Sequence, residues 1–278
     1  MLERAHRAAL RLALAQELEA WQSRHWVLDL WWRDDDAHQD TAALRALLSI
    51  PERPTIVLSV IPGVLEPTLS SLLEKDGRNA VIQHGWKHVN HSRPGEQPSE
   101  YPDQRSRDDI ARELDLGSRV LSETFGPSFM PAFVPPWHAF SASLATELAD
   151  RGYMLSVGAR GFPFKSQSGV CVERNVDIDT ANWEADGRFI GTSVLSVALI
   201  DGLRLRSAAR REHCPLGILT HHYLLNDDDL ADLGELFAFL SKSPAVNFLA
   251  PADLFSSRGP KKSVVLQPPA KPGDASRQ

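Results

Sequence analysis

The stretch VLDLWWRDDD (residues 27–36) decides the fold, because it joins a short apolar run directly to four charged side chains. The apolar part, VLDLWW (27–32), has the length and composition of a buried strand and stops abruptly at Arg33. Three aspartates follow at 34–36. Buried carboxylates without partners are costly, so the three cannot all be ordinary core residues. The stretch therefore predicts a buried strand with polar side chains at its carboxyl end.

Three other predicted strands end in the same way. AVIQ (80–83) runs into HGWKH, MPAFV (130–134) into PPWH, and LGILT (216–220) into His221 and His222. The carboxyl ends of the strands in a parallel barrel share one face, and active sites lie on that face. We therefore expect four loops, far apart in the sequence, to converge on one pocket.

Strands and helices alternate along most of the chain, which is typical of a parallel α/β fold. Further strands are predicted at 55–62, 153–158 and 169–178. Helices are predicted at 4–22, 40–49, 66–75, 108–126, 141–151 and 230–242. Six or seven such units favour a barrel over a small open sheet. We expect one domain over residues 1–258 and a flexible tail over 259–278, which holds four prolines.

The composition narrows the class of protein. The 278 residues include 30 basic and 36 acidic side chains, a formal net charge of −6, which does not suit a nucleic-acid binder. The sequence has no apolar run of the roughly 18 residues that a membrane helix needs. The N-terminus does not resemble a signal peptide. Cys171 and Cys214 are too few for a disulfide scaffold. We therefore expect a cytoplasmic protein with two reduced thiols.

The segment HGWKH (84–88) places His84 and His88 four residues apart, so on a helical turn both imidazoles could bind one metal ion. The alternative is a solvated, histidine-rich loop. The acidic cluster at 34–36 favours the metal site, since two histidines and one aspartate leave positions open for water and substrate. A neighbouring aspartate could then transfer protons, whereas the alternative for the cluster is a solvated loop that caps the next helix.

Five of the seven tryptophans lie in or beside the polar clusters. They are Trp31, Trp32, Trp86, Trp137 and Trp183. Indole faces stack well on sugar rings, and large aromatic side chains also fill barrel cores. Trp86 and Trp137 are the best candidates for lining a groove.

The order of these motifs resembles that of the polysaccharide deacetylases, the group that includes the nodulation-factor chitooligosaccharide deacetylases. Arg-Asp-Asp-Asp-Ala (33–37) resembles their Thr-Phe-Asp-Asp-Gly motif, and residues 84–88 have the spacing of their His-Ser/Thr-x-x-His motif. Val-Pro-Pro-Trp-His (134–138) resembles Arg-Pro-Pro-Tyr-Gly. Leu-Thr-His (219–221) matches their Leu-x-His.

The chain departs from the family pattern at the third motif. Val134 stands where the family has the arginine that steadies the catalytic aspartate, and His138 replaces the glycine. Arg33, beside the aspartates, could supply the missing charge. The segment 177–183, with two aspartates and a tryptophan, is a looser match to the family's Asp-and-Trp motif. The resemblance spans about residues 27–250.

The resemblance implies a distorted (β/α)7-type barrel and a metal-dependent hydrolase. Asp35 and Asp36 fall in the paired positions of the first motif. Asp36, His84 and His88 would hold a divalent metal ion, with zinc expected, and the ion would lower the pKa of a water molecule. Asp35 would act as the general base that takes the proton from this water.

The resemblance also implies groups for the leaving amine and for the oxyanion. Successive strand positions point to opposite faces, so only one of His221 and His222 should enter the barrel mouth. His221 is in the Leu-x-His position and is expected to be the general acid. Pro135 and Pro136 have no N–H, so Trp137 supplies the first backbone donor of its loop. The other groups expected around the substrate are Arg33, Trp86, Pro136, Trp137, His138 and His222.

The function expected from the resemblance is removal of an acetyl group, N-acetyl ahead of O-acetyl, from a sugar or small glycan. Two alternatives remain. The chain could be a metal-dependent barrel hydrolase that cleaves another bond. It could also be a non-catalytic carbohydrate-binding relative, because the motif arginine is missing. The expected partner is an acetylated sugar or small glycan, with no nucleic acid and no membrane.

Overall fold

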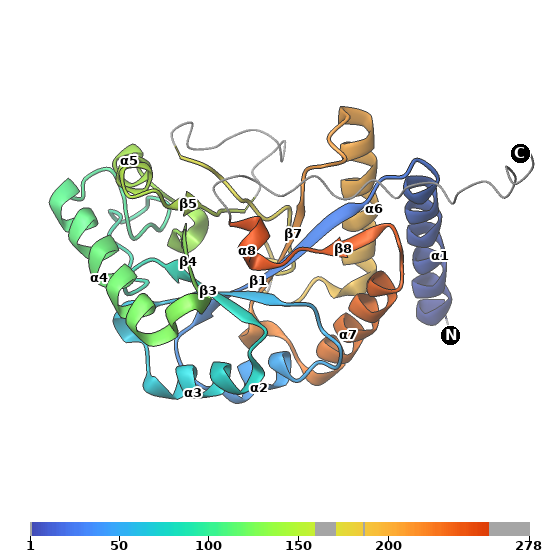
Figure 1. Cartoon of the computed structure of the whole chain (residues 1–278), viewed down its shortest axis with the longest axis horizontal. Coiled ribbons are helices and arrows are strands. Elements are labelled where there is room, and N and C mark those ends of the chain that lie inside the picture. The colour runs from blue at the N-terminus through green and yellow to red at the C-terminus, as the bar shows by residue number, and fades with distance from the viewer. Residues whose placement is uncertain (1, 159–170, 186, 256–278) are drawn as a thin grey trace, which may run out of the picture.

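The computed structural model describes residues 2–158, 171–185 and 187–255, and its centre is a curled sheet of parallel strands (Figure 1). Seven strands follow the order β5-β4-β3-β2-β1-β7-β6, and β8 (Val246–Phe248) pairs with the first residues of β1. The seven are β1 (Leu28–Ala37), β2 (Ile56–Val60), β3 (Asn79–His84), β4 (Phe129–Val134), β5 (Met154–Leu155), β6 (Ile178–Asp179) and β7 (Leu216–Thr220). The arrangement confirms the predicted fold class, a distorted (β/α)7 barrel.

The two edges of the sheet are linked by the chain that leads into β6. Leu155 in β5 forms a parallel bridge to Glu173, and Gly158 forms one to Val176. The same stretch then continues into β6, which pairs with β7. This segment therefore pairs first with one edge, through isolated bridges, and then with the other through the two residues of β6.

Helices flank the sheet, with α4 and α5 at one end and α1, α6 and α7 at the other (Figure 1). They are α1 (Leu2–Ser23), α2 (Ala42–Leu48), α3 (Pro67–Asp76), α4 (Arg107–Phe125), α5 (Ala142–Asp150), α6 (Gly191–Ala209), α7 (Asp227–Ser241) and α8 (Pro251–Leu254). Short 3-10 turns occupy η1 (Pro62–Val64), η2 (Gly126–Ser128), η3 (Pro136–His138) and η4 (His222–Leu224). Within the described ranges, no helix has both the length and the hydrophobicity that crossing a bilayer requires.

Helix α6 is one of the longest helices, yet it is not predicted from the sequence pattern. Leu195 and Leu199 are buried, whereas Val194 and Val197 on the same helix are exposed. Apolar residues on both faces blur the periodicity from which an amphipathic helix is recognised. The predicted tail, 259–278, lies outside the described residues.

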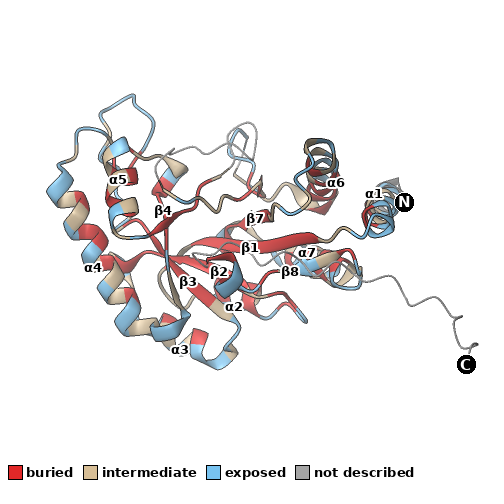
Figure 2. Cartoon of the chain, turned by 45° about the horizontal axis from the view of Figure 1, so that its top comes forward, coloured by how far each residue is buried: buried red, intermediate tan, exposed pale blue. Residues whose placement is uncertain are grey.

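The alternation of side chains along β1 separates two hydrophobic clusters. Leu30 and Trp32 belong to the cluster that includes the leucines of the flanking helices. Trp31 belongs to a second cluster, formed by the inner faces of the strands together with α8 and residues near it. Figure 2 shows that β1 is buried along nearly its whole length. Residues 31, 33 and 35 therefore face the barrel interior, because side chains alternate along a strand.

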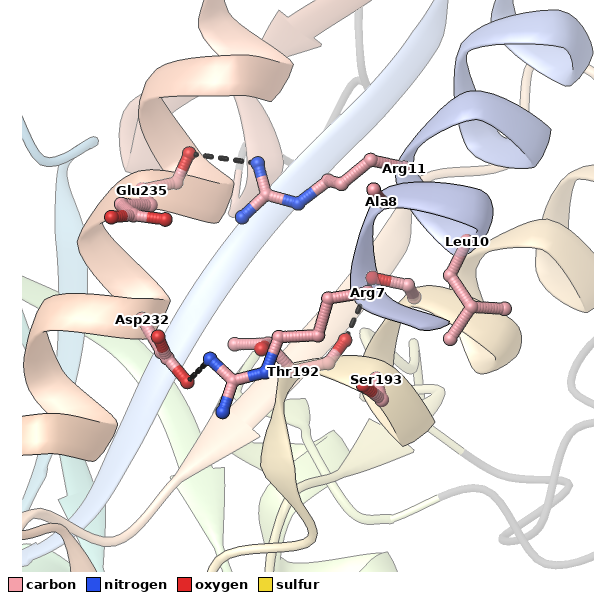
Figure 3. Close-up of a pocket in the computed structure, with 9 residues that line it drawn as sticks. Arg7, Ala8, Leu10, Arg11, Thr192, Ser193, Asp232 and Glu235 are labelled. Atoms are coloured by element: carbon pink, nitrogen blue, oxygen red, sulfur yellow. Dashed lines mark hydrogen bonds and ion pairs between the residues drawn. The ribbon is translucent and has the colours of Figure 1, made fainter. Parts of the chain in front are cut away.

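The N-terminal helix α1 packs beside α6 and also contacts α7. Figure 3 shows Arg7 and Arg11 reaching from α1 toward α7 across a cavity of about 260 Å³. Arg7 forms an ion pair with Asp232, and Arg11 donates a hydrogen bond to the carbonyl oxygen of Glu235. These contacts attach the helix expected over residues 4–22 to the outside of the barrel.

Candidate functional site

A cleft of about 610 Å³ opens at the carboxyl ends of the strands. Its walls come from the ends of β1, β3, β6 and β7 and from the loops that follow β3 and β4, so the four predicted clusters do converge. It is lined by Asp35, Asp36, His84, His88, Gln97, Pro98, Trp137, His138, Asp179, Trp183, His221 and Tyr223. Most of these residues belong to motifs predicted from the sequence, whereas Gln97, Pro98 and Tyr223 do not.

A bulge in β1 brings two adjacent aspartates to the same cleft. Regular alternation would place Asp35 in the barrel interior and turn Asp36 toward the helices. Asp36 instead has a left-handed backbone (φ 72°), and the pairing with β2 shifts register between Asp34 and Ala37. A bulge re-aims a side chain in this way, and bulges are common beside active sites. The Nδ1–H of His38 donates to the carbonyl oxygen of Asp36 (3.0 Å).

Asp36, His84 and His88 form the one group of three or more metal-ligand side chains within the described residues. One ligand atom from each lies within 4.8 Å of the other two. The Oδ1 atom of Asp36 lies 3.0 Å from His84 Nε2 and 3.4 Å from His88 Nε2. The Oδ2 atom accepts a hydrogen bond from the Tyr223 hydroxyl (3.0 Å), so one carboxylate oxygen is left to face both imidazoles.

The donor set fits a divalent metal ion. The Nδ1–H of His84 donates to the carbonyl oxygen of Val134 (3.0 Å), which leaves Nε2 to face Asp36. A metal-ligating histidine characteristically fixes its other ring nitrogen in this way. Burial would raise the pKa of Asp36, but the hydrogen bond and charge of His84 lower it below its usual range. Two imidazoles and an ionised carboxylate can bind a divalent metal ion and leave a coordination position open.

The two histidines do not lie on a helical turn, contrary to the geometry assumed from their spacing. His84 is the last residue of β3, and residues 85–88 are non-helical. Gly85 (φ 58°) and His88 (φ 57°) have left-handed backbones, which fold the chain back on itself. The convergence of the imidazoles therefore depends on local backbone geometry rather than on a helix.

Asp35 is paired with Arg33 inside the barrel. Arg33 is fully buried (0% exposed), and its Nε lies 2.9 Å from Oδ1 of Asp35. A second guanidinium nitrogen donates to Oδ2 (3.1 Å), and the Ser59 hydroxyl donates to Oδ1 (2.7 Å). Burial would raise the pKa of Asp35, but the charge of Arg33 holds it well below its usual range. Asp35 is therefore ionised at neutral pH.

His138, which stands where the family motif has glycine, completes this buried cluster. Its Nε2 lies 2.9 Å from an Arg33 nitrogen, and a guanidinium can only donate, so Nε2 accepts. Burial and the charge of Arg33 lower the pKa of His138 despite the nearby Asp35. The ring is therefore neutral and engaged with Arg33. Ser156 accepts another Arg33 hydrogen bond (2.6 Å).

The alternation expected after β7 sends His221 and His222 to different places. His221 lines the cleft, and within the described residues its buried Nδ1 has no hydrogen-bond partner. His222 lies on the other face, where its Nδ1–H donates to Asp34 (2.6 Å). Burial would lower the pKa of His222, but the Asp34 carboxylate raises it. The Thr220 hydroxyl also donates to Asp34 (2.7 Å), so this third aspartate is buried with partners.

Solved structures of carbohydrate esterases share this architecture. A family 4 carbohydrate esterase from Streptomyces lividans in complex with acetate matches with a TM-score of 0.51 and 14% identity, over 85% of this chain and 98% of that one. A CE4 esterase from Streptococcus mutans matches with a TM-score of 0.52 and 13% identity, over 84% and 90%. The fold is that of the family 4 carbohydrate esterases. No protein-family model matches the chain, and no curated protein sequence does.

The aromatic residues divide between the cleft of this esterase fold and its core. Trp137 is tilted against the His88 ring, with the centroids 4.4 Å apart, and Trp183 meets the His221 ring edge-on at 5.0 Å. Both line the cleft. Trp31 and Trp32 are buried core residues. The Trp86 ring packs near Gly63, and it is not among the side chains that line the cleft.

The looser Asp-and-Trp motif is only partly represented in the cleft. Asp179 and Trp183 line it, and the indole N–H of Trp183 donates to Asp179 (2.8 Å). Asp177 instead forms an ion pair with Arg206 of α6 (2.9 Å). Tyr223 was not predicted as a site residue, although it directly follows His221 and His222 at the carboxyl end of a strand, which is the signal that could have indicated it.

Replacing His84 or His88 with alanine is expected to lower the affinity for a divalent ion at least about tenfold, because loss of an outer-shell partner alone costs about 10–100-fold. Calorimetric titration of the ion-free protein with Zn²⁺ measures the change. His213→Ala, at an exposed histidine outside the cleft, is the matched control and should bind as the wild type does. Wild-type affinity in both site variants would remove the ligand assignment.

Proposed function

We propose that this protein is a metal-dependent deacetylase that hydrolyses an acetyl group, N-acetyl ahead of O-acetyl, on a sugar or small glycan. The proposal depends on one observation: two adjacent aspartates lie in the same cleft and have different hydrogen-bond and ion-pair partners. Asp36 faces two imidazoles, and Asp35 is ionised against Arg33. A ligand carboxylate beside a separate base is the arrangement that metal-assisted hydrolysis needs.

Asp36, His84 and His88 would hold the ion, which we propose to be zinc and which, when bound, supplies Lewis-acid activation of a water molecule and of the acetyl carbonyl. Asp35 accepts the proton of the attacking water as general base. Arg33 keeps Asp35 ionised and fixes both of its oxygens, which compensates for the valine at position 134.

His221 is the proposed general acid, because its ring lines the cleft and, within the described residues, has no carboxylate or guanidinium hydrogen-bonded to its nitrogens. It would donate a proton to the leaving amine. His222 is bonded to Asp34, and His138 to Arg33, so neither is available in the same way. The Trp137 backbone N–H is the proposed donor to the oxyanion, since the two preceding prolines have none.

The cleft wall supports a sugar as substrate. Trp137, Trp183 and Tyr223 are partly exposed (37%, 55% and 50%) and line the cleft around the proposed catalytic groups. Aromatic rings of this kind offer flat apolar faces to pyranose rings. The esterase from Streptomyces lividans holds acetate in its structure, and acetate is the product that deacetylation releases. We propose an acetylated monosaccharide or short glycan as the substrate.

Purified protein loaded with Zn²⁺ is expected to release acetate from N-acetylated sugars, because the cleft pairs a base with an ion site. Acetate release from a panel of N-acetylated and O-acetylated sugars, with phosphoesters and peptides as comparison substrates, tests this. Turnover of a phosphoester or peptide alone would favour another class of barrel hydrolase. Stoichiometric metal and sugar binding without any turnover would favour a non-catalytic binding protein.

The two aspartates are expected to respond differently to substitution. Asp36→Ala should lose bound metal, because it removes the oxygen shared by the two histidines. Asp35→Asn should keep metal and lose activity by about 10²–10⁴-fold, the range for a general acid–base group. Metal content and steady-state acetate release are measured on each variant. Loss of metal in Asp35→Asn, with retention in Asp36→Asn, would reverse the two roles.

The two histidines after β7 are distinguished by the pH dependence of the rate. A protonated acid and an ionised base give a bell-shaped profile, and loss of the acid should flatten the alkaline limb. His221→Ala should flatten that limb at unchanged metal content, whereas His222→Ala should retain it. An intact alkaline limb in His221→Ala would transfer the role to His222 or His138.

A further inference from the structure

The loop that carries the two histidine ligands has none of the hydrogen bonds of a helix. Residues 85–88 follow β3 as irregular chain, with left-handed backbones at Gly85 and His88. A short irregular loop has no intrinsic reason to keep two imidazoles on one carboxylate. Something outside the loop must therefore satisfy its backbone groups and fix its shape.

Glu100 contacts this loop through its whole carboxylate. Oε2 accepts the backbone N–H of Trp86 (3.0 Å), and Oε1 accepts that of Lys87 (2.7 Å). Glu100 is 1% exposed, so the two amide bonds form out of water, where they are stronger. The carboxylate thus supplies the acceptors for two successive amides of an irregular loop.

Gly85 allows the carboxylate to come so close. A Cβ atom at position 85 would lie 2.0 Å from Oε2 of Glu100 and 2.7 Å from the Pro136 ring. The φ angle of Gly85 (58°) is also one that other residues adopt at a cost. Gly85 and Glu100 therefore act together, because the glycine leaves the space that the carboxylate occupies.

The rest of the loop backbone is held from other directions. The Gly85 N–H donates to the Val134 carbonyl (3.1 Å), and the Gln83 side chain donates to the Gly85 carbonyl (3.1 Å). The Gly63 N–H donates to the Trp86 carbonyl (2.7 Å). Glu100 is the member of this set that binds two successive amides and brings a formal charge, so the loop depends on it most.

We propose that Glu100 is a positioning residue for the ion site, holding the backbone of residues 84–88 so that His84 and His88 converge on Asp36. The inference rests on the proposed function, because it takes these three side chains to be metal ligands. Glu100 is not among the residues that line the cleft, and it contacts the loop through backbone amides rather than through the imidazoles.

Glu100→Gln is the sharpest test, because it keeps the shape of the side chain and turns one acceptor into an N–H₂ donor that faces an N–H. The variant is expected to bind Zn²⁺ and Co²⁺ about 10–100-fold more weakly, the range for outer-shell partners. The visible spectrum of the Co²⁺ form, which reports ligand geometry, should also change. Thermal unfolding of the ion-free proteins is measured alongside.

Glu147→Gln is the matched control. Glu147 is a buried carboxylate of α5 whose two oxygens accept hydrogen bonds from Arg107 and Arg151, and within the described residues it makes no hydrogen bond to Glu100 or to the ion loop. It should leave the affinity and the Co²⁺ spectrum unchanged. Wild-type affinity and spectrum in Glu100→Gln would overturn the proposal. A wild-type protein that binds no divalent ion would overturn the proposed function as well, whereas metal binding without acetate release would leave the role of Glu100 standing.

If Glu100→Gln fails to fold, amide hydrogen exchange of the ion-free wild-type protein decides the matter. The amides of Trp86 and Lys87 should exchange slowly, because each is bonded to the buried carboxylate. Exchange at these two amides as fast as at the exposed Val89 would show that Glu100 does not hold the loop.

Discussion

The buried charge of Arg33 is the interaction on which the mouth of the barrel depends. A guanidinium with no access to water would be very costly without partners, and the partners of Arg33 come from its own strand and from the chain after β4 and β5. Asp35 shares its strand, Ser59 joins through Asp35 from β2, Ser156 follows β5, and His138 comes from the turn after β4. One side chain thus fixes the relative positions of four segments and the orientation of the proposed base.

The parts of the site that follow from strand periodicity could be predicted from the sequence. Apolar runs that end in polar residues predicted where the strands end. The parallel topology predicted that these ends converge on one face. Alternation also separated His221 from His222, because neighbouring positions on β7 must face opposite sides. The order of the motifs assigned Asp35 and Asp36 to the paired positions of the first motif, and both side chains line the cleft.

The parts that depend on tertiary contact could not be predicted. Nothing in the sequence marks the bulge at Asp36, although aspartate tolerates a left-handed backbone better than most residues. The spacing of His84 and His88 suggested a helical turn, because the sequence does not show that a glutamate twelve residues later would hold the loop instead. Gln97 and Pro98 come from an irregular segment without periodicity, so no pattern could place them in the cleft.

The left-handed residues of the site have a consequence for the balance between folding and ligand affinity. Asp36, His88, Trp137 and His138 all have positive φ angles, and such backbones cost on the order of 1–3 kcal/mol each. The hydrophobic clusters on either side of the sheet must supply this free energy before any ligand arrives. The side chains at these positions therefore lose their conformational freedom when the protein folds. Little further conformational entropy is then lost when a ligand binds. A chain with unstrained backbones at these four positions would have a larger free energy of unfolding, and it would bind the ligand more weakly.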